Sequence, residues 1–142
     1  MTAPFHPVVI HFPLALLSTV ALLEVLAVIL KRDDLSRAGW WVQLAGTIGI
    51  LLAVLTGIVA ENATMIPAPA AGAVDIHEQL AFVCSSAFAG LLLWRVAART
   101  KIPGASPWGY LALYCVSVVL LFVVGWYGGE LVFHYGVGVL PK

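Results

Sequence analysis

The chain has 142 residues, of which 62% are hydrophobic and 10% charged, with a formal net charge of zero and a mean hydropathy of +1.03. Soluble domains carry about 25% charged residues, so this composition excludes an ordinary water-soluble domain. The balanced charge gives no basic field for nucleic acid. We therefore expect one integral membrane domain covering residues 1–142, in contact with a lipid bilayer.

The first apolar run, at 7–30, exceeds the about 20 residues that a helix needs to cross a bilayer. Pro7 suits the first helical turn, where the missing backbone N–H has no intrahelical partner to lose. Basic residues follow this run instead of preceding it, and the run is too long for a signal peptide. It is predicted to remain as a transmembrane helix.

The second apolar run, at 38–60, has Ser36 before it as a candidate N-cap. Small residues recur every four positions along it and form one continuous face: Ala45, Gly49, Ala53 and Gly57. Such a face allows close helix packing or oligomerisation in a membrane. It could also leave room for a flat ligand.

The third and fourth runs cover 76–97 and 107–127. Asp75 followed by Glu78 has the spacing of a capping box at the start of the third helix. The fourth helix is predicted to begin at Ser106 and Pro107 and to end at the glycine pair 128–129. Cys84 and Cys115 lie inside these runs without a metal-binding or redox spacing and are predicted to be small buried hydrophobes.

Short connections between the four runs favour an all-α, antiparallel four-helix bundle. The loops after the first and third runs carry most of the basic residues, which the positive-inside rule places in the cytoplasm. Both termini are then predicted to face the outer, periplasmic side. The basic residues on the predicted cytoplasmic side are Lys31, Arg32, Arg37, Arg95, Arg99 and Lys101.

Glu24 lies about 10 Å inside the first helix, measured from its predicted cytoplasmic end. A carboxylate at this depth needs a partner, and Arg95 of the third helix or Gln43 of the second can reach it. A Glu–Arg pair would be structural, whereas an isolated Glu24 would be a candidate proton relay.

All four histidines fall at the predicted outer end of the bundle: His6, His11, His77 and His134. His11 lies in an apolar run about 7 Å deeper than His6. A polar residue there usually faces the bundle interior. In one interpretation His11 bonds a backbone carbonyl and the histidines are structural.

In the other interpretation, His11 and His77 ligate a cofactor between the first and third helices, with His6 as an alternate ligand. Imidazole binds haem iron axially, and facing helices of a bundle can hold a b-type haem. Haem propionates prefer cationic partners, which this end almost lacks. A transition-metal ion held by His11, His77, Glu78 and Glu130 is therefore the competing ligand.

No phosphate-binding loop, HExxH or GxSxG motif is present, so no catalytic residue is predicted and hydrolysis is not expected. Whether the protein is an enzyme stays open, and an active chain would have a redox role.

The opening HPVVIHFP at 6–13, the histidine–glutamate pair at 77–78, and GGELVF at 128–133 followed by GVGV at 136–139 together resemble one family. These are the predicted bacterial membrane proteins grouped as domain of unknown function 2231 (DUF2231), and the resemblance covers essentially the whole chain. Phe133 stands where relatives often carry tyrosine, so a hydroxyl is lost there.

The resemblance implies a multi-pass protein of the bacterial inner membrane. It also implies association with Rieske-type or c-type cytochrome modules, and hence an electron-transfer role at the outer face, with such a protein or a quinone as partner. The alternative is a non-redox accessory or assembly subunit with structural histidines, which its small-residue faces could make a homo-oligomer.

Overall fold

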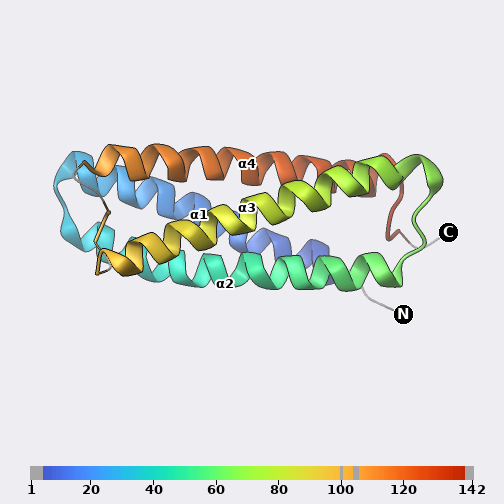
Figure 1. Ribbon diagram of the computed structural model, residues 1–142, viewed down its shortest axis with the longest axis horizontal. Helices are drawn as coiled ribbons and strands as arrows, with labels where there is room; N and C mark the ends of the chain where they lie inside the picture. Colours follow the sequence, from blue (N-terminus) through green and yellow to red (C-terminus); the bar gives the residue numbers. More distant parts are fainter. Residues whose placement is uncertain (1–4, 100, 104–105, 140–142) are drawn as a thin grey trace.

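The computed structural model describes residues 5–99, 101–103 and 106–139. Figure 1 shows four long helices joined by short connections into an antiparallel bundle. They are α1 (Phe5–Leu30), α2 (Asp33–Ala63), α3 (Ala71–Ala97) and α4 (Pro107–Phe133), with a 3-10 helix, η1 (Ala68–Ala70), leading into α3. Each of the four is long and apolar enough to cross a membrane. The all-helical bundle predicted from the sequence is confirmed.

The helices extend beyond the apolar runs, and three of the predicted end signals are wrong. α2 begins at Asp33, so Ser36 lies one turn inside it. α3 continues from η1 at Ala71, which places Asp75 and Glu78 inside the helix instead of at its cap. α4 runs through the glycine pair at 128–129 to Phe133. A helical glycine costs about 1 kcal/mol, less than the unsatisfied backbone groups that an earlier end would leave in an apolar environment.

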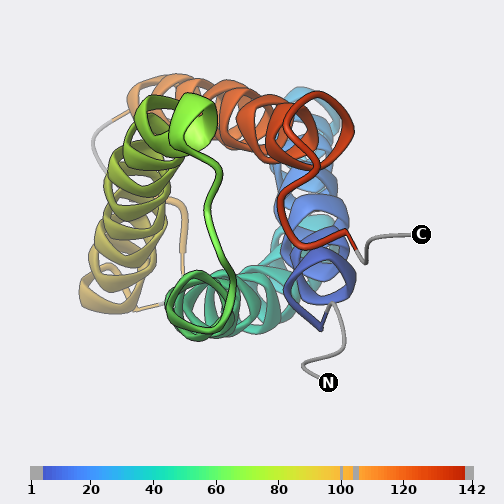
Figure 2. The same cartoon turned by 90° about the vertical axis from the view of Figure 1, so that its right-hand side faces the viewer.

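The start of α4 agrees with the sequence, because Ser106 is its N-cap residue and Pro107 opens its first turn. The Ser106 side chain makes no capping hydrogen bond. Beyond the other end of α4 the chain turns back, and the amide of Val137 donates to the carbonyl of Leu131 at 2.9 Å. Figure 2 shows this segment folded across the end of the bundle.

The helices stand at the corners of a four-sided bundle, with α1 and α3 on one diagonal and α2 and α4 on the other (Figure 2). The most extensive packing joins α1 to α2, where glycines allow a close approach. A Cβ at Gly46 would lie 2.8 Å from Leu17 Cδ2, and one at Gly49 would lie 3.2 Å from Phe12 Cδ1. Gly46, and not the predicted Ala45, belongs to this buried seam.

The bundle is apolar inside and outside. Leu17, Ile50 and Phe88 belong to the buried core, whereas large apolar side chains are exposed along every helix. Such a surface suits a hydrocarbon solvent. Cys84 is buried as predicted, but Cys115 is exposed, because it lies on the outer face of α4.

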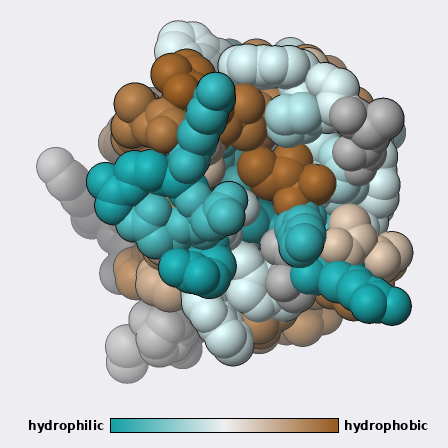
Figure 3. Space-filling view, turned by 90° about the vertical axis from the view of Figure 1, so that its left-hand side faces the viewer, coloured by the Kyte–Doolittle hydropathy of each residue, from teal (hydrophilic) through white to brown (hydrophobic). Residues whose placement is uncertain are grey.

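The two ends of the bundle differ in charge. Figure 3 looks onto the end where α1 meets α2 and α3 leads to α4, and shows a group of hydrophilic side chains there. Lys31 and Arg99 adopt φ of 54° and 56° at its two turns, where glycine would be less strained by about 1–2 kcal/mol. The exposed charged residues of this end are Lys31, Arg32, Asp33, Asp34, Arg37, Arg99 and Lys101.

Candidate functional site

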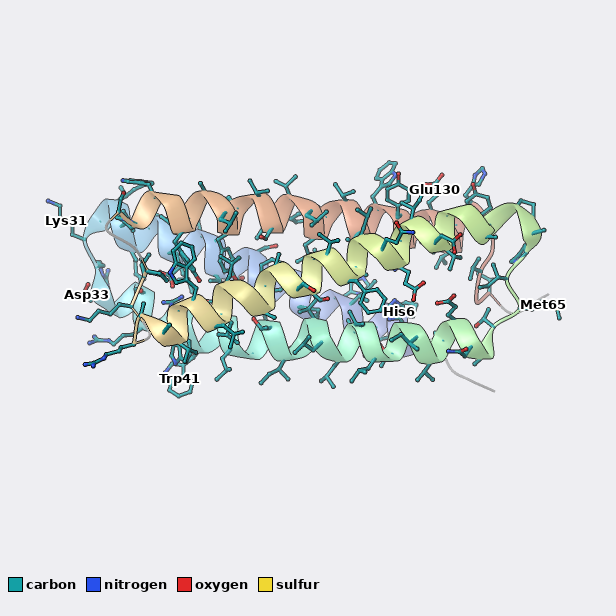
Figure 4. The ribbon with its side chains drawn as sticks, in the orientation of Figure 1. His6, Lys31, Asp33, Trp41, Met65 and Glu130 are labelled. Atoms are coloured by element: carbon teal, nitrogen blue, oxygen red, sulfur yellow. The ribbon has the colours of Figure 1, made fainter. Side chains whose placement is uncertain are left out.

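Two histidines from diagonal helices face each other near the opposite end of the bundle. His6 lies in the first turn of α1 and His77 in the second turn of α3. Their ring centroids are 6.4 Å apart, with 80° between the ring planes. Figure 4 shows His6 toward the end of the bundle away from Lys31 and Asp33.

The position of the proton on His6 follows from its hydrogen bond. His6 Nδ1 lies 3.2 Å from Thr56 Oγ1 on α2, and the Thr56 hydroxyl itself donates to the carbonyl of Ala53 at 3.0 Å. Because that hydroxyl has one proton, its oxygen can only accept from His6. Nδ1 therefore carries the proton in neutral His6, and Nε2 carries the lone pair.

His77 has the same tautomer for a simpler reason. Its Nδ1 lies 3.1 Å from the carbonyl oxygen of Val124 on α4, which can only accept. Nε2 of neutral His77 is again the nitrogen with a lone pair. An Nδ1–H bonded to a fixed oxygen is the usual way in which proteins orient an imidazole that binds through Nε2.

Each ring packs against a glycine of the next helix. A Cβ at Gly57 of α2 would lie 3.2 Å from His6 Cε1, and one at Gly128 of α4 would lie 3.1 Å from His77 Cε1. Any larger residue at either position would press on the ring. From the sequence, Gly57 was predicted on the small-residue face of the second helix, whereas Gly128 was predicted to end the fourth helix. No sequence pattern indicated a role for Thr56.

His11, the predicted partner of His77, is on the exposed side of α1. Its Nδ1 lies 2.6 Å from the carbonyl oxygen of Pro7, one turn earlier in the same helix. The structure thus contains the backbone bond that the structural interpretation gave to His11, with the ring on the exposed side and not in the bundle interior. The structure brings His6, the predicted alternate, to His77 instead.

The predicted metal ligands His11, His77, Glu78 and Glu130 do not gather at one point. Across the described ranges, no group of three or more His, Cys, Asp or Glu side chains could hold a metal ion. Glu78 and Glu130 are both half-buried, and the exposed ring of His134 packs on Tyr135 with centroids 4.6 Å apart.

A second polar cluster lies in the basic half of the bundle, and it confirms the predicted partner of Glu24. Arg95 Nη1 is 2.5 Å from Glu24 Oε1, and both side chains are fully buried. The same nitrogen donates to Gln43 Oε1 at 2.8 Å, while Nη2 donates to the carbonyl of Ser36 at 2.8 Å. The Arg95 guanidinium also lies 5.9 Å from the ring centroid of Trp40, a cation–π distance.

The fourth helix joins this network through Tyr110, whose hydroxyl donates to Gln43 Oε1 at 3.1 Å. The close contact of α1 with α2 at this level depends on Gly39, because a Cβ there would overlap Glu24 Oε1. The network therefore links all four helices, and Glu24 is part of a structural ion pair.

The family model described as "Predicted membrane protein (DUF2231)" matches residues 2–141. The chain belongs to this family. No curated protein and no solved structure matches it.

The family assignment agrees with the resemblance drawn from the opening and closing motifs. In this DUF2231 protein the opening motif supplies His6, which faces His77, and the closing motif supplies Gly128, which packs on the His77 ring. Two motifs more than 100 residues apart in the sequence thus meet at the same pair of imidazoles.

Small residues also open a groove, but on a different face from the one expected. A mainly apolar cavity of about 360 Å³ lies between α3 and α4 and not between α1 and α3. It is lined by Ser86, Ala87, Gly90, Leu91, Trp94, Leu113 and Ser117.

Proposed function

We propose that this protein is a membrane electron carrier that holds a b-type haem between His6 of α1 and His77 of α3. The single observation that carries the proposal is the geometry of this pair. Two imidazoles that bind one iron through Nε2, at about 2 Å each, would place their ring centroids about 6 Å apart. The observed separation is 6.4 Å, between diagonal helices.

The small number of ligands favours haem over a free metal ion. Mononuclear zinc and most transition-metal sites take three or four protein ligands, and the described residues offer no such group. A porphyrin supplies four nitrogens itself and needs axial ligands alone from the protein. A pair of imidazoles is therefore a complete protein ligand set for haem and an incomplete one for a bare divalent ion.

The charged ends indicate the direction of the site. If the basic turns at 31–37 and 99–101 face the cytoplasm, as the positive-inside rule requires, the histidine pair faces the periplasm of a bacterial inner membrane. The haem would take up and release single electrons there. The partner would be a quinone in the bilayer, a c-type cytochrome or a Rieske-type protein.

The test is a visible spectrum of the protein purified in detergent from haem- and metal-replete cells, before and after reduction with dithionite, together with a metal analysis. A Soret band that shifts on reduction is expected. A stoichiometric metal without a Soret band would replace haem by an ion held between the same imidazoles. A purified protein that contains neither haem nor a stoichiometric metal would overturn the proposal.

The ligands are tested by three histidine variants. His6→Ala and His77→Ala should each abolish or reshape the spectrum, while His11→Ala is a matched control on the same helix whose ring is exposed. Loss of the spectrum in His11→Ala and its retention in His6→Ala would reverse the assignment.

One feature of the pair favours a second function, that of an accessory or assembly subunit without a cofactor. Each Nδ1 bonds an acceptor within the bundle and each ring packs on a glycine, as structural histidines would. In that case, His6→Ala and His77→Ala would weaken the fold in a protein that shows no visible absorption.

A further inference from the structure

Three buried polar atoms at the edge of the Glu24–Arg95 network have no hydrogen-bond partner among the described residues. They are Gln43 Nε2, Thr47 Oγ1 and the hydroxyl of Tyr114. Gln43 and Tyr114 are fully buried, and Thr47 is 2% exposed. Buried polar groups are almost always paired, so three such atoms in one region need an explanation.

The three atoms lie on one side of the network. Gln43 Oε1 accepts from both Arg95 and Tyr110, so the other arm of its amide points away from these donors. Thr47 follows Gln43 by one turn on α2, and Tyr114 follows Tyr110 by one turn on α4. Both helices run away from the basic end, and each turn advances about 5.4 Å. The two hydroxyls therefore lie at a similar depth, next to the network toward the centre of the bundle.

The surroundings set limits on what could pair with these atoms. Tyr114 lies beside Tyr110, with ring centroids 5.9 Å apart, and the Tyr110 hydroxyl bonds the same Gln43 oxygen as Arg95. The Glu24–Arg95 pair has no net charge, so it offers no net attraction to a further ion of either sign. On the other side, Phe88 packs on Tyr114 with ring centroids 5.4 Å apart.

We infer that the bundle binds ordered water among Gln43, Thr47 and Tyr114, and that this water extends the Glu24–Arg95 network toward the membrane centre. The amide nitrogen can only donate, whereas each hydroxyl can donate and accept. Water is the smallest neutral molecule that complements both, and buried waters typically make two to four such bonds. The half of the bundle near its basic turns is thus a hydrated polar site that does not depend on a haem.

The test compares Thr47→Val, Tyr114→Phe and the double variant by reversible unfolding in detergent. If water bridges the hydroxyls, each single change breaks hydrogen bonds and lowers the folded-to-unfolded ratio about 2- to 10-fold. The double variant should lower this ratio by less than the product of the two single effects, because each single change already breaks the same water bridge. Thr19→Val is the matched control, since the exposed Thr19 hydroxyl bonds the carbonyl of Ala15 in its own helix.

If the site contains no water, the expected effect of Tyr114→Phe on the folded-to-unfolded ratio is different. Tyr114→Phe would then remove an unpaired hydroxyl and leave the ratio unchanged or raise it, which would overturn the inference. A second measurement does not depend on stability. Solid-state NMR in bilayers should show magnetisation transfer from water to Thr47 but not to Ile50, a buried core residue of the same helix. Equal transfer to both, or none to Thr47, would also overturn it.

Discussion

Replacing Arg95 with leucine should destabilise the bundle severely. The change leaves Glu24 fully buried without the cation that lies 2.5 Å from it, and it takes a donor from Gln43 and from Ser36. Breaking a buried ion pair by removing one partner costs about 3–5 kcal/mol. Such a loss is a large fraction of a total stability of about 5–15 kcal/mol.

A double variant distinguishes the loss of the ion-pair attraction from the cost of leaving one charge buried without a partner. In Glu24→Leu combined with Arg95→Leu no buried charge is left, and replacing both members of a buried pair is often neutral or stabilising. We therefore expect the double variant to recover most of the stability lost in Arg95→Leu. Reversible unfolding in detergent, followed by helicity, measures both variants against the unchanged protein.

The exposed ion pair of Arg32 and Asp34 provides the control. Its side chains are 57% and 48% exposed, so Arg32→Leu should change stability little. A loss in Arg95→Leu no larger than that in Arg32→Leu would refute the reasoning. Purely additive losses in the double variant would do the same, because the pair would then be uncoupled.

Two further predictions concern the histidine pair. In Gly128→Ala the new Cβ would lie 3.1 Å from His77 Cε1, so the spectrum of a bound haem should change. Gly129→Ala is the control and should leave the spectrum unaltered, because a Cβ at Gly129 meets nothing within 4 Å. Identical spectra in both variants would contradict this packing. Thr56→Val removes the acceptor that orients His6 and should weaken haem binding about 10- to 100-fold in a titration of the apoprotein. An unchanged affinity would show that the hydroxyl does not position the ring.

The pairing of Glu24 with Arg95 could be predicted from the sequence because hydrocarbon leaves few choices. A carboxylate inside a span must find a partner, and the sequence offers few cations at that depth. The helix starts and ends were harder to predict. A span that stays in an apolar environment keeps its backbone hydrogen bonds through glycines at 128–129, which would end many helices in water.

Hydropathy by itself determined that this chain forms four helices long and apolar enough to cross a membrane. The tertiary structure alone decided which imidazole faces His77. His6 and His11 are five residues apart, which turns their side chains about 140° from each other around α1, so one faces inward when the other faces out. In a soluble helix the contrast between polar and apolar faces would have distinguished them. These helices are apolar on all sides, so the inward position of His6 is set by its packing against Gly57 and its hydrogen bond to Thr56.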